Sequence, residues 1–228
     1  MRANRIVSLL ASAMAATSAA LYALIGIPSA SAAPCPDVEV VFARATTEPP
    51  GVGEVGQAFV DALRSQAGER SVSVYAVNYP ATEDFPNSAS VGANDARARV
   101  QTVAATCPTT RMVLGGYSQG AIVIDLITAL PVAFAGFTPA PMPPEVADHV
   151  AAVAVLGNPL DRYLGGPLTS VSPQFGPKAI DLCVPGDPIC SPGNTAMPSR
   201  DEMFSDAHLS YVKSGMAIQA ATFAASRL

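Results

Sequence analysis

The sequence predicts an α/β sandwich of three layers around a central five-stranded parallel sheet, and three observations support this. Five apolar runs occur, and most of them are short and rich in valine with little alternation, which is typical of strands buried on both faces. Helical patterns separate them, and alternating strands and helices imply right-handed crossovers covering both faces of a parallel sheet. The 228-residue chain has no internal repeat and suits one domain with a sizeable core. The expected strands cover residues 38–43, 72–77, 111–115, 150–156 and 179–183.

Apolar side chains spaced for one helix face justify the helices between these strands. Val55, Phe59 and Leu63 recur at a spacing of four in the first helix, and Ile122, Leu126 and Leu130 share a face of the third. The other expected helices cover residues 88–106 and 209–224, and the third covers 118–130.

The first 32 residues have the features of a secretory signal peptide. Arg2 and Arg5 precede an apolar stretch that ends in Ser29-Ala30-Ser31-Ala32-Ala33, an A-x-A-type cleavage site. An uncleaved membrane anchor is the rival interpretation, because the stretch is long enough to span a bilayer. The small residues before Pro34 favour cleavage after Ala32 or Ala33. We therefore expect export and release of one domain covering residues 33–228.

The charge balance argues against nucleic acid as a partner. The whole chain has a formal net charge of −5, and the first 32 residues hold two arginines and no acid, so the remainder is more acidic. No run of lysine and arginine occurs along the sequence. We expect a monomer with no membrane-spanning segment after cleavage, secreted and either extracellular or associated with the cell envelope.

All four cysteines follow the expected cleavage site, in the oxidising environment that an exported protein meets. Cys183 and Cys190 are close in sequence and bracket a proline-rich loop, so a disulfide between them would close a small ring. That leaves Cys35 and Cys107, which precede two parallel strands and so lie at the same edge of the sheet. A zinc site is the rival interpretation, but no histidine falls at ligand spacing.

The pentapeptide Gly116-Tyr117-Ser118-Gln119-Gly120 matches the nucleophile elbow of a serine hydrolase. It follows an apolar strand pattern and precedes a helical one, which is the setting this motif requires. The turn is tight enough to strain the serine backbone, and the glycines keep side chains from colliding where strand and helix meet. The helix that follows directs its N-terminal N–H groups at negative charge formed beside Ser118.

A serine nucleophile needs a general base, and the sequence offers two histidines. His149 directly precedes a strand, so it lies at the amino edge of the sheet, roughly one strand length of 20 Å from Ser118. We expect it to be a surface or capping residue. His208 follows the last strand, in a loop that starts at the carboxyl edge and can fold back over Ser118. His208 is therefore the predicted base.

The base needs a carboxylate, and four of the aspartates between Ser118 and His208 are candidates: Asp161, Asp187, Asp201 and Asp206. Asp201 and Asp206 fit solvated loop charges. Asp161 and Asp187 each follow a strand, so both remain candidates. Asp187 is favoured because it lies inside the expected Cys183–Cys190 ring, where a clamped loop would hold an orienting carboxylate with little freedom.

Taken together, these residues resemble the cutinases, specifically the mycobacterial-type cutinase-like carboxylesterases, over essentially the whole exported chain. The matching segments are Val41-Phe42-Ala43-Arg44 with Thr46-Thr47-Glu48, Val77-Asn78-Tyr79-Pro80, the elbow itself, Cys183-x-x-Gly186-Asp187-x-x-Cys190, and His208-Leu209-Ser210-Tyr211. The resemblance implies Ser118 as nucleophile, Asp187 as triad acid, His208 as base and the two disulfides named above.

The resemblance also implies an oxyanion hole formed by the backbone N–H of Gln119 and by the N–H and hydroxyl of Thr46. The position of Thr46, just past the first strand, agrees with that role. A simple cap or turn is its rival interpretation. Ala45 stands where the family usually has glycine, and a positive φ there would strain alanine and displace the Thr46 donors. Phe85 and residues 159–175 supply apolar side chains for an acyl groove, or else for loop packing.

The sequence thus predicts a secreted carboxylesterase that hydrolyses short- to medium-chain fatty acid esters through an acyl-enzyme, with no metal or organic cofactor. A lipase, a phospholipase or a polyester-degrading cutinase would use the same triad. A peptidase is less favoured by the resemblance. A secreted binding protein that keeps the fold without catalysis is the rival from another class.

Overall fold

The computed structural model describes residues 34–163, 166–191 and 198–228. The signal peptide expected over residues 1–32 lies outside these residues. Within the described part of the chain, no helix is long and apolar enough to cross a membrane.

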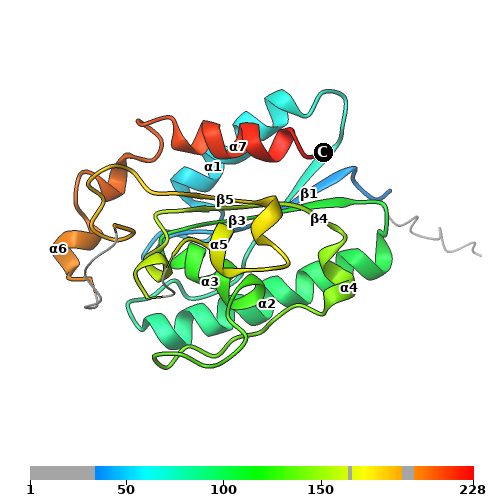
Figure 1. Cartoon of the computed structure of the whole chain (residues 1–228). Helices are drawn as coiled ribbons and strands as arrows, with labels where there is room; N and C mark the ends of the chain where they lie inside the picture. The colour runs from blue at the N-terminus through cyan, green and yellow to red at the C-terminus, as the bar shows by residue number, and fades with distance from the viewer. Residues whose placement is uncertain (1–33, 164–165, 192–197) are drawn as a thin grey trace, which may run out of the picture. The chain divides into compact units, whose positions relative to one another are not determined.

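Five parallel strands form one sheet, as the sequence predicts, and the structure gives their order as β2-β1-β3-β4-β5 (Figure 1). The central strands β1, β3 and β4 are almost wholly buried, whereas the edge strand β2 is half-buried along its length. Helices therefore cover both faces of the sheet at its centre. The strands are β1 (Val38–Ala43), β2 (Val72–Ala76), β3 (Arg111–Tyr117), β4 (Val150–Leu156) and β5 (Ala179–Leu182).

The longer helices divide into two layers (Figure 1). Helices α1 (Gly53–Gln66) and α7 (Met216–Ala225) pack together on one face of the sheet, and α2 (Phe85–Thr106) and α3 (Gln119–Thr128) on the other. Each layer closes a separate apolar core against the sheet, which gives the three-layer sandwich. Short elements complete the described chain: α4 (Pro144–Ala147), η1 (Pro159–Arg162), α5 (Leu168–Val171), η2 (Gly176–Lys178), α6 (Arg200–Met203) and η3 (His208–Ser210).

The expected last helix is wrong at its start. The sequence predicts it from residue 209, but α7 begins at Met216. His208–Ser210 forms a 3₁₀ turn instead, and Gly215 adopts φ +78°, a left-handed conformation that interrupts any continuous helix. The other predicted strands and helices end within a few residues of the observed ones, with β3 reaching Tyr117 and α2 beginning at Phe85.

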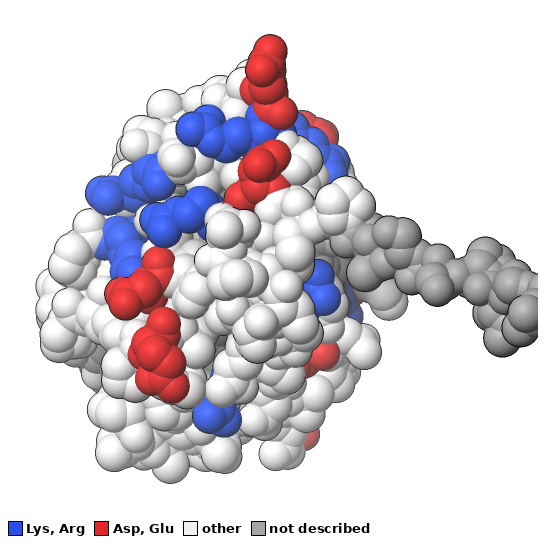
Figure 2. All heavy atoms as spheres, turned by 90° about the vertical axis from the view of Figure 1, so that its right-hand side faces the viewer, with Lys and Arg blue, Asp and Glu red and all other residues white. Residues whose placement is uncertain are grey.

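The two disulfides pair as expected. Cys35 bonds Cys107, which joins the segment before β1 to the end of α2, and Cys183 bonds Cys190 around the loop after β5. Figure 2 shows the side of the molecule on which the chain enters β1. There the lysine and arginine side chains lie among aspartate and glutamate, separated by broad uncharged areas.

The strand register places three loops beside one another at the carboxyl edge of the sheet. Ala43 pairs with Gly116, Tyr117 with Leu156, and Leu156 with Leu182. The loops that leave β1, β3 and β5 therefore emerge together at the point where the elbow turns.

Candidate active site

Ser118 occupies the turn between β3 and α3 in a strained conformation, with φ 56° and ψ −118°. A positive φ is uncommon for any residue except glycine and marks a turn whose surroundings impose it. Neighbouring backbone makes the two glycines of the motif necessary. A Cβ at Gly116 would lie 2.2 Å from the carbonyl oxygen of Gly120, and one at Gly120 would lie 2.0 Å from that of Ala43. The turn thus has the geometry of a nucleophile elbow.

The structure brings together the three residues predicted for the triad. His208 Nε2 lies 2.9 Å from Ser118 Oγ, and His208 Nδ1 lies 2.9 Å from Asp187 Oδ2. Asp187 is fully buried, while His208 is 2% and Ser118 8% exposed. These distances align a hydroxyl, an imidazole and a carboxylate in one hydrogen-bonded chain.

Asp187 is held by more than its contact with His208. Its Oδ1 accepts the Ile189 N–H at 2.8 Å, and its Oδ2 accepts the Tyr211 hydroxyl at 2.7 Å. Burial opposes ionisation of this carboxyl group. The hydrogen bond and charge of His208, with the bonds from Tyr211 and Ile189, outweigh burial and hold the Asp187 pKa below its ordinary value. Asp187 is therefore an ionised acceptor at neutral pH.

The loop that carries Asp187 is tied at two further points. The Cys183–Cys190 disulfide closes it, and Arg162 of η1 donates from Nη1 to the Pro188 carbonyl oxygen at 2.9 Å. The expectation that a clamped loop carries the acid agrees with this arrangement.

Asp161, the second candidate for the acid, lies in a different buried cluster. Asn158 Nδ2 donates to Asp125 Oδ2 at 2.9 Å and to Asp181 Oδ2 at 3.1 Å, and the Leu168 N–H also donates to Asp181 Oδ2. Burial raises the pKa of Asp125, Asp161 and Asp181, and that of Asp161 reaches about 9 with the Asp181 carboxyl adding to the effect. A carboxyl group that holds its proton at neutral pH fits an anchor of η1 better than a partner of His208.

The remaining candidates lie where the sequence placed them. His149 precedes β4 at the amino edge, half-buried, with Nδ1 3.2 Å from the Pro108 carbonyl oxygen. Asp201 and Asp206 are exposed to solvent. None of these three side chains has a hydrogen bond to Ser118 or His208 among the described residues.

The two predicted oxyanion donors lie on segments that the surrounding structure holds. The Gln119 amide bridges neighbouring elements, donating to the Thr82 carbonyl oxygen at 2.7 Å and accepting from the Ser88 hydroxyl at 3.2 Å. Thr46 lies in the loop after β1 and lines the same groove as Ser118. Within the described residues, no protein acceptor takes the backbone N–H of Thr46 or Gln119.

Ala45 does not have the strained backbone considered for it. Its φ is not positive, and the left-handed conformation in this loop falls on Thr47, with φ 64°. Glu48 shapes the loop, because its carboxylate accepts the N–H groups of Ala45 at 2.7 Å and of Glu54 at 2.8 Å. Alanine therefore fits this position without the steric cost that a positive φ would bring.

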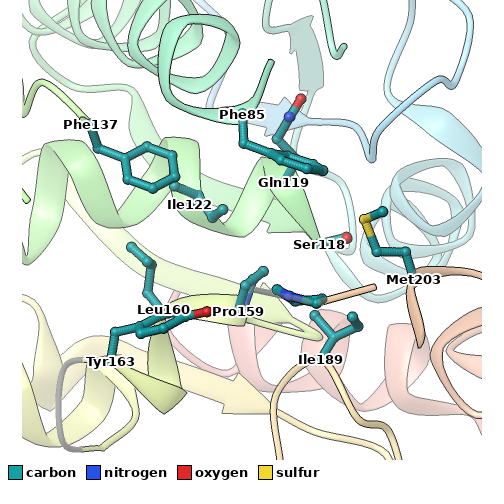
Figure 3. A pocket seen from close by; sticks show the side chains of 11 residues that line it. Phe85, Ser118, Gln119, Ile122, Phe137, Pro159, Leu160, Tyr163, Ile189 and Met203 are labelled. Carbon is teal, nitrogen blue, oxygen red and sulfur yellow. The ribbon is translucent and has the colours of Figure 1, made fainter. Parts of the chain in front are cut away.

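Two pockets meet at Ser118. One is lined almost entirely by apolar side chains, with Phe137, Ile122 and Tyr163 at the end away from Ser118 (Figure 3). The other is a larger groove whose lining includes Thr46, Glu54 and His208.

The sequence was partly right about the apolar lining. Phe85, Pro159, Leu160 and Tyr163 do line the apolar pocket, as expected for an acyl groove. Phe175 does not, because it packs in the core beneath α3 at 2% exposure.

A parallel five-stranded sandwich with a strained serine between strand and helix defines an α/β hydrolase. The comparisons with known proteins specify the family. The Cutinase family model matches residues 34–228. The chain is 51% identical to "Carboxylesterase Culp1" of Mycobacterium tuberculosis (strain H37Rv) over 220 residues, which cover 94% of this chain and 92% of that protein. It is 52% identical to "Phospholipase Culp4" of the same strain, covering 99% and 93%.

Solved structures agree with the fold. A Trichoderma reesei cutinase in complex with a phosphonate inhibitor is 31% identical with a TM-score of 0.61, covering 85% of this chain and 77% of that one. An acetylxylan esterase is 23% identical with a TM-score of 0.67, covering 85% and 99%, and shows the fold alone. The chain belongs to the cutinase family and is a carboxylic ester hydrolase.

Sequence reasoning missed two features of the site. It assigned no role to Tyr211, although the spacing from His208 was visible in the final motif. It also did not foresee the buried cluster of Asp125, Asp161 and Asp181, whose members lie on three separate elements. No local sequence pattern marks such a cluster.

Proposed function

We propose that the protein is a secreted serine carboxylesterase that hydrolyses short- to medium-chain fatty acid esters, with Ser118, His208 and Asp187 as its triad. The observation that carries this proposal is the position of His208, whose two ring nitrogens each lie 2.9 Å from a partner, Ser118 Oγ and Asp187 Oδ2. This geometry supports general-base activation of a serine hydroxyl.

The reaction follows from that chain of contacts. The Ser118 hydroxyl donates to His208 Nε2, and the His208 Nδ1–H donates to the Asp187 carboxylate. As Ser118 Oγ attacks the ester carbonyl, its proton moves to Nε2 and Asp187 stabilises the imidazolium. His208 then protonates the leaving alcohol, and an acyl-enzyme remains. Water, deprotonated by His208, attacks this ester and releases the acid.

The tetrahedral intermediate carries its negative charge on the former carbonyl oxygen. In the proposed mechanism, that oxygen accepts the Gln119 N–H and the N–H and hydroxyl of Thr46. Among the described residues, neither backbone N–H has a protein acceptor, so both can bind the oxyanion at no cost in existing hydrogen bonds. The N-terminus of α3 adds its partial positive charge at the same point. Such preorganised donors stabilise the transition state by about 3 kcal/mol each.

The two pockets suit the two halves of an ester. We assign the acyl chain to the apolar pocket, because side chains such as Ile122, Phe137 and Leu160 line it and offer no charged group. The small size of this pocket supports a preference for short to medium chains. The alcohol occupies the larger groove, whose lining mixes polar and apolar side chains and whose width accepts leaving groups of varied size.

A lipase or phospholipase activity is a second candidate on the same triad. It is supported by the 52% identity to a protein named "Phospholipase Culp4" and by the width of the groove assigned to the alcohol. A polyester-degrading cutinase is a third, because an open groove also admits a polymer chain.

Export is part of the proposal. The signal-peptide pattern over residues 1–32 supports it, as do the two disulfides, which persist in oxidising compartments. Mass spectrometry of protein collected from the culture medium would test it, with an N-terminus at Ala33 or Pro34 as the expected result. An uncleaved, cell-bound chain would contradict it.

The test of the activity is a p-nitrophenyl ester series from acetate to palmitate. Wild type is run beside Ser118→Ala, with Ser65→Ala, an exposed serine on α1, as the matched control. We expect a rate maximum at or below medium chain length, loss of nearly all activity in Ser118→Ala, and wild-type rates in Ser65→Ala. A Ser118→Ala variant that keeps most of the rate would overturn the assignment of the nucleophile.

Labelling with a fluorophosphonate separates an esterase from a non-catalytic binding protein of the same fold. We expect one label per oxidised, folded chain, on the peptide that contains Ser118. A folded sample that takes no label and hydrolyses no ester would exclude the enzyme.

A further inference from the structure

Tyr211 is fully buried beside the proposed triad, and its hydroxyl has three polar neighbours. It donates to Asp187 Oδ2 at 2.7 Å, accepts the Val184 N–H at 3.2 Å, and lies 3.3 Å from Cys190 Sγ. The oxygen that accepts from Tyr211 is the same oxygen that accepts from His208 Nδ1. Two donors therefore share one carboxylate oxygen.

The local backbone explains why this tyrosine reaches Asp187. His208–Ser210 is a 3₁₀ turn, in which side chains three residues apart lie above one another. Tyr211 follows His208 by three residues, so both side chains point toward the loop that carries Asp187. Gly157 leaves room for the pair: it has φ +56°, and a Cβ there would lie 3.0 Å from both the Tyr211 hydroxyl and the His208 ring.

Neighbouring rings hold Tyr211 in place. Its ring lies 5.1 Å from that of Tyr117 and meets that of His208 edge-on at 6.1 Å. The Tyr117 hydroxyl in turn donates to the backbone carbonyl oxygen of His208. The two tyrosines thus act on different atoms, with Tyr211 bonded to the carboxylate and Tyr117 to the backbone of the histidine.

We propose that Tyr211 is a positioning residue for the esterase reaction, which fixes the Asp187 carboxylate and draws negative charge away from the oxygen that faces His208. This inference rests on the proposed function of Ser118, His208 and Asp187. Tyr211 lines neither pocket, so it acts through Asp187 and makes no contact with substrate.

The electrostatic surroundings support a permanent donor. Burial and the adjacent Asp187 carboxylate raise the pKa of Tyr211 well above its ordinary value, so the hydroxyl keeps its proton throughout the working pH range. Among the described residues, the titratable groups that act on Asp187 are His208 and Tyr211. Burial and the charge of Asp187 also raise the pKa of Tyr117. Cys190 does not titrate, because it is in a disulfide.

Tyr211→Phe keeps the ring and deletes the donor. We expect kcat to fall by roughly tenfold, because Asp187 loses one of the bonds that orient it, while KM stays within about twofold. We also expect the acid limb of the kcat/KM profile to move to higher pH. The carboxylate then presents more negative charge to His208 and favours its protonated, inactive form.

A second variant changes the strength of the donor and keeps both ring and hydroxyl. Incorporation of 3-fluorotyrosine at position 211 makes the hydroxyl more acidic and a stronger donor. The acid limb should then move to lower pH, opposite to its movement in Tyr211→Phe. This variant keeps the proposal falsifiable even if the phenylalanine variant folds poorly.

Tyr75→Phe is the matched control. Tyr75 also donates to a carboxylate, that of Asp95 at 3.0 and 3.1 Å, but outside the site. We expect no shift of its pH profile. The downfield NMR resonance of the His208 Nδ1 proton gives a reading independent of turnover, and it should move in both Tyr211 variants and remain in place in Tyr75→Phe.

The outcomes separate this inference from the proposed function. If both Tyr211 variants lower the melting temperature but leave kcat, the acid limb and the Nδ1 resonance at wild-type values, Tyr211 is only a packing residue and the inference is wrong. If wild type itself hydrolyses no ester, the proposed function fails instead.

Discussion

Replacing Asp187 by asparagine tests the assignment of the acid most directly. The Asp187 carboxylate accepts three donors: the Ile189 N–H, the Tyr211 hydroxyl and His208 Nδ1. An amide of the same shape has one acceptor oxygen and one NH₂ group. In either orientation, at least one existing donor must face an N–H in a fully buried site.

The two orientations have different costs. If the amide oxygen faces His208 and Tyr211, its NH₂ group meets the Ile189 N–H, which leaves two buried donors unpaired. If the amide is reversed, NH₂ faces His208 Nδ1, and the histidine must carry its proton on Nε2. In that tautomer Nε2 cannot accept the proton of Ser118. Each unpaired buried donor costs about 1–3 kcal/mol, so the first orientation is unfavourable and the variant can adopt the reversed one. In the reversed orientation His208 no longer acts as the general base.

The expected loss is about a thousand- to ten-thousandfold in kcat, or about 4 to 5.5 kcal/mol in the activation free energy. KM should stay within a few-fold, because Asp187 lines neither pocket. Hydrolysis of p-nitrophenyl butyrate under saturating conditions measures both constants, and circular dichroism checks the fold.

Asp161→Asn is the matched comparison, because the same chemical change falls on the other candidate acid. Asp161 holds its proton at neutral pH, so an amide replaces a group that is already neutral, and kcat should change by less than about threefold. The reasoning would be refuted by an Asp187→Asn variant within tenfold of wild type, or by an Asp161→Asn variant that loses as much.

Two further predictions concern stability. Asp161 has a pKa of about 9 in the folded state, whereas an exposed aspartate has a pKa near 3.8. The folded chain therefore binds more protons than the unfolded chain between these pH values, so its free energy of unfolding falls as pH rises through this range. Urea unfolding from pH 5 to 9 measures how the free energy of unfolding changes with pH. This dependence should be weaker in Asp161→Asn than in wild type and unchanged in Asp148→Asn, an exposed control. An equal dependence in all three proteins would count against the buried cluster. For the disulfides, the Cys35–Cys107 bond spans 72 residues and the Cys183–Cys190 bond spans 7. Loop entropy therefore predicts that replacing the two cysteines by serine lowers the free energy of unfolding by about 4.4 kcal/mol for the first pair and about 2.4 kcal/mol for the second. The smaller loss should nevertheless bring the larger fall in kcat, because that ring holds Asp187; a larger fall in kcat for the Cys35 and Cys107 pair would contradict this.

Most of the sandwich was predictable because its signals are local. A strand buried on both faces requires an apolar run, and five apolar runs, most of them rich in valine, mark the five strands. The signal for the elbow is equally local. A Cβ at position 116 would lie 2.2 Å from a backbone oxygen and one at position 120 would lie 2.0 Å from another, so only glycine fits at either position. The last helix was misplaced because the apolar pattern continues through Leu209 and Val212, while the φ of Gly215 depends on how the chain leaves the His208 turn.

The choice between the two candidate acids shows where local signals end. Both Asp161 and Asp187 follow a strand and precede His208, so their positions in the sequence do not distinguish them. Asp187 was favoured only because it lies inside the expected disulfide ring. In the folded chain, Asp187 lies beside His208, whereas Asp161, a residue of η1, lies close to Asp125 and Asp181. The charge state of each carboxyl group depends on neighbours contributed by other elements, and these neighbours are far away in sequence.

By itself, the sequence determined the order of strands and helices, the position of Ser118 on a strained turn and the edge of the sheet at which its partners had to lie. These properties follow from backbone sterics and apolar periodicity within a few residues. The tertiary structure alone decided which carboxylate meets His208, which loop residue carries the positive φ near Ala45, and that Tyr211 shares the Asp187 oxygen. The contacts of Asp187 with His208 and Tyr211 join separate loops more than 20 residues apart in sequence, and a hydrogen bond within 3 Å is set by how the whole sheet brings those loops together.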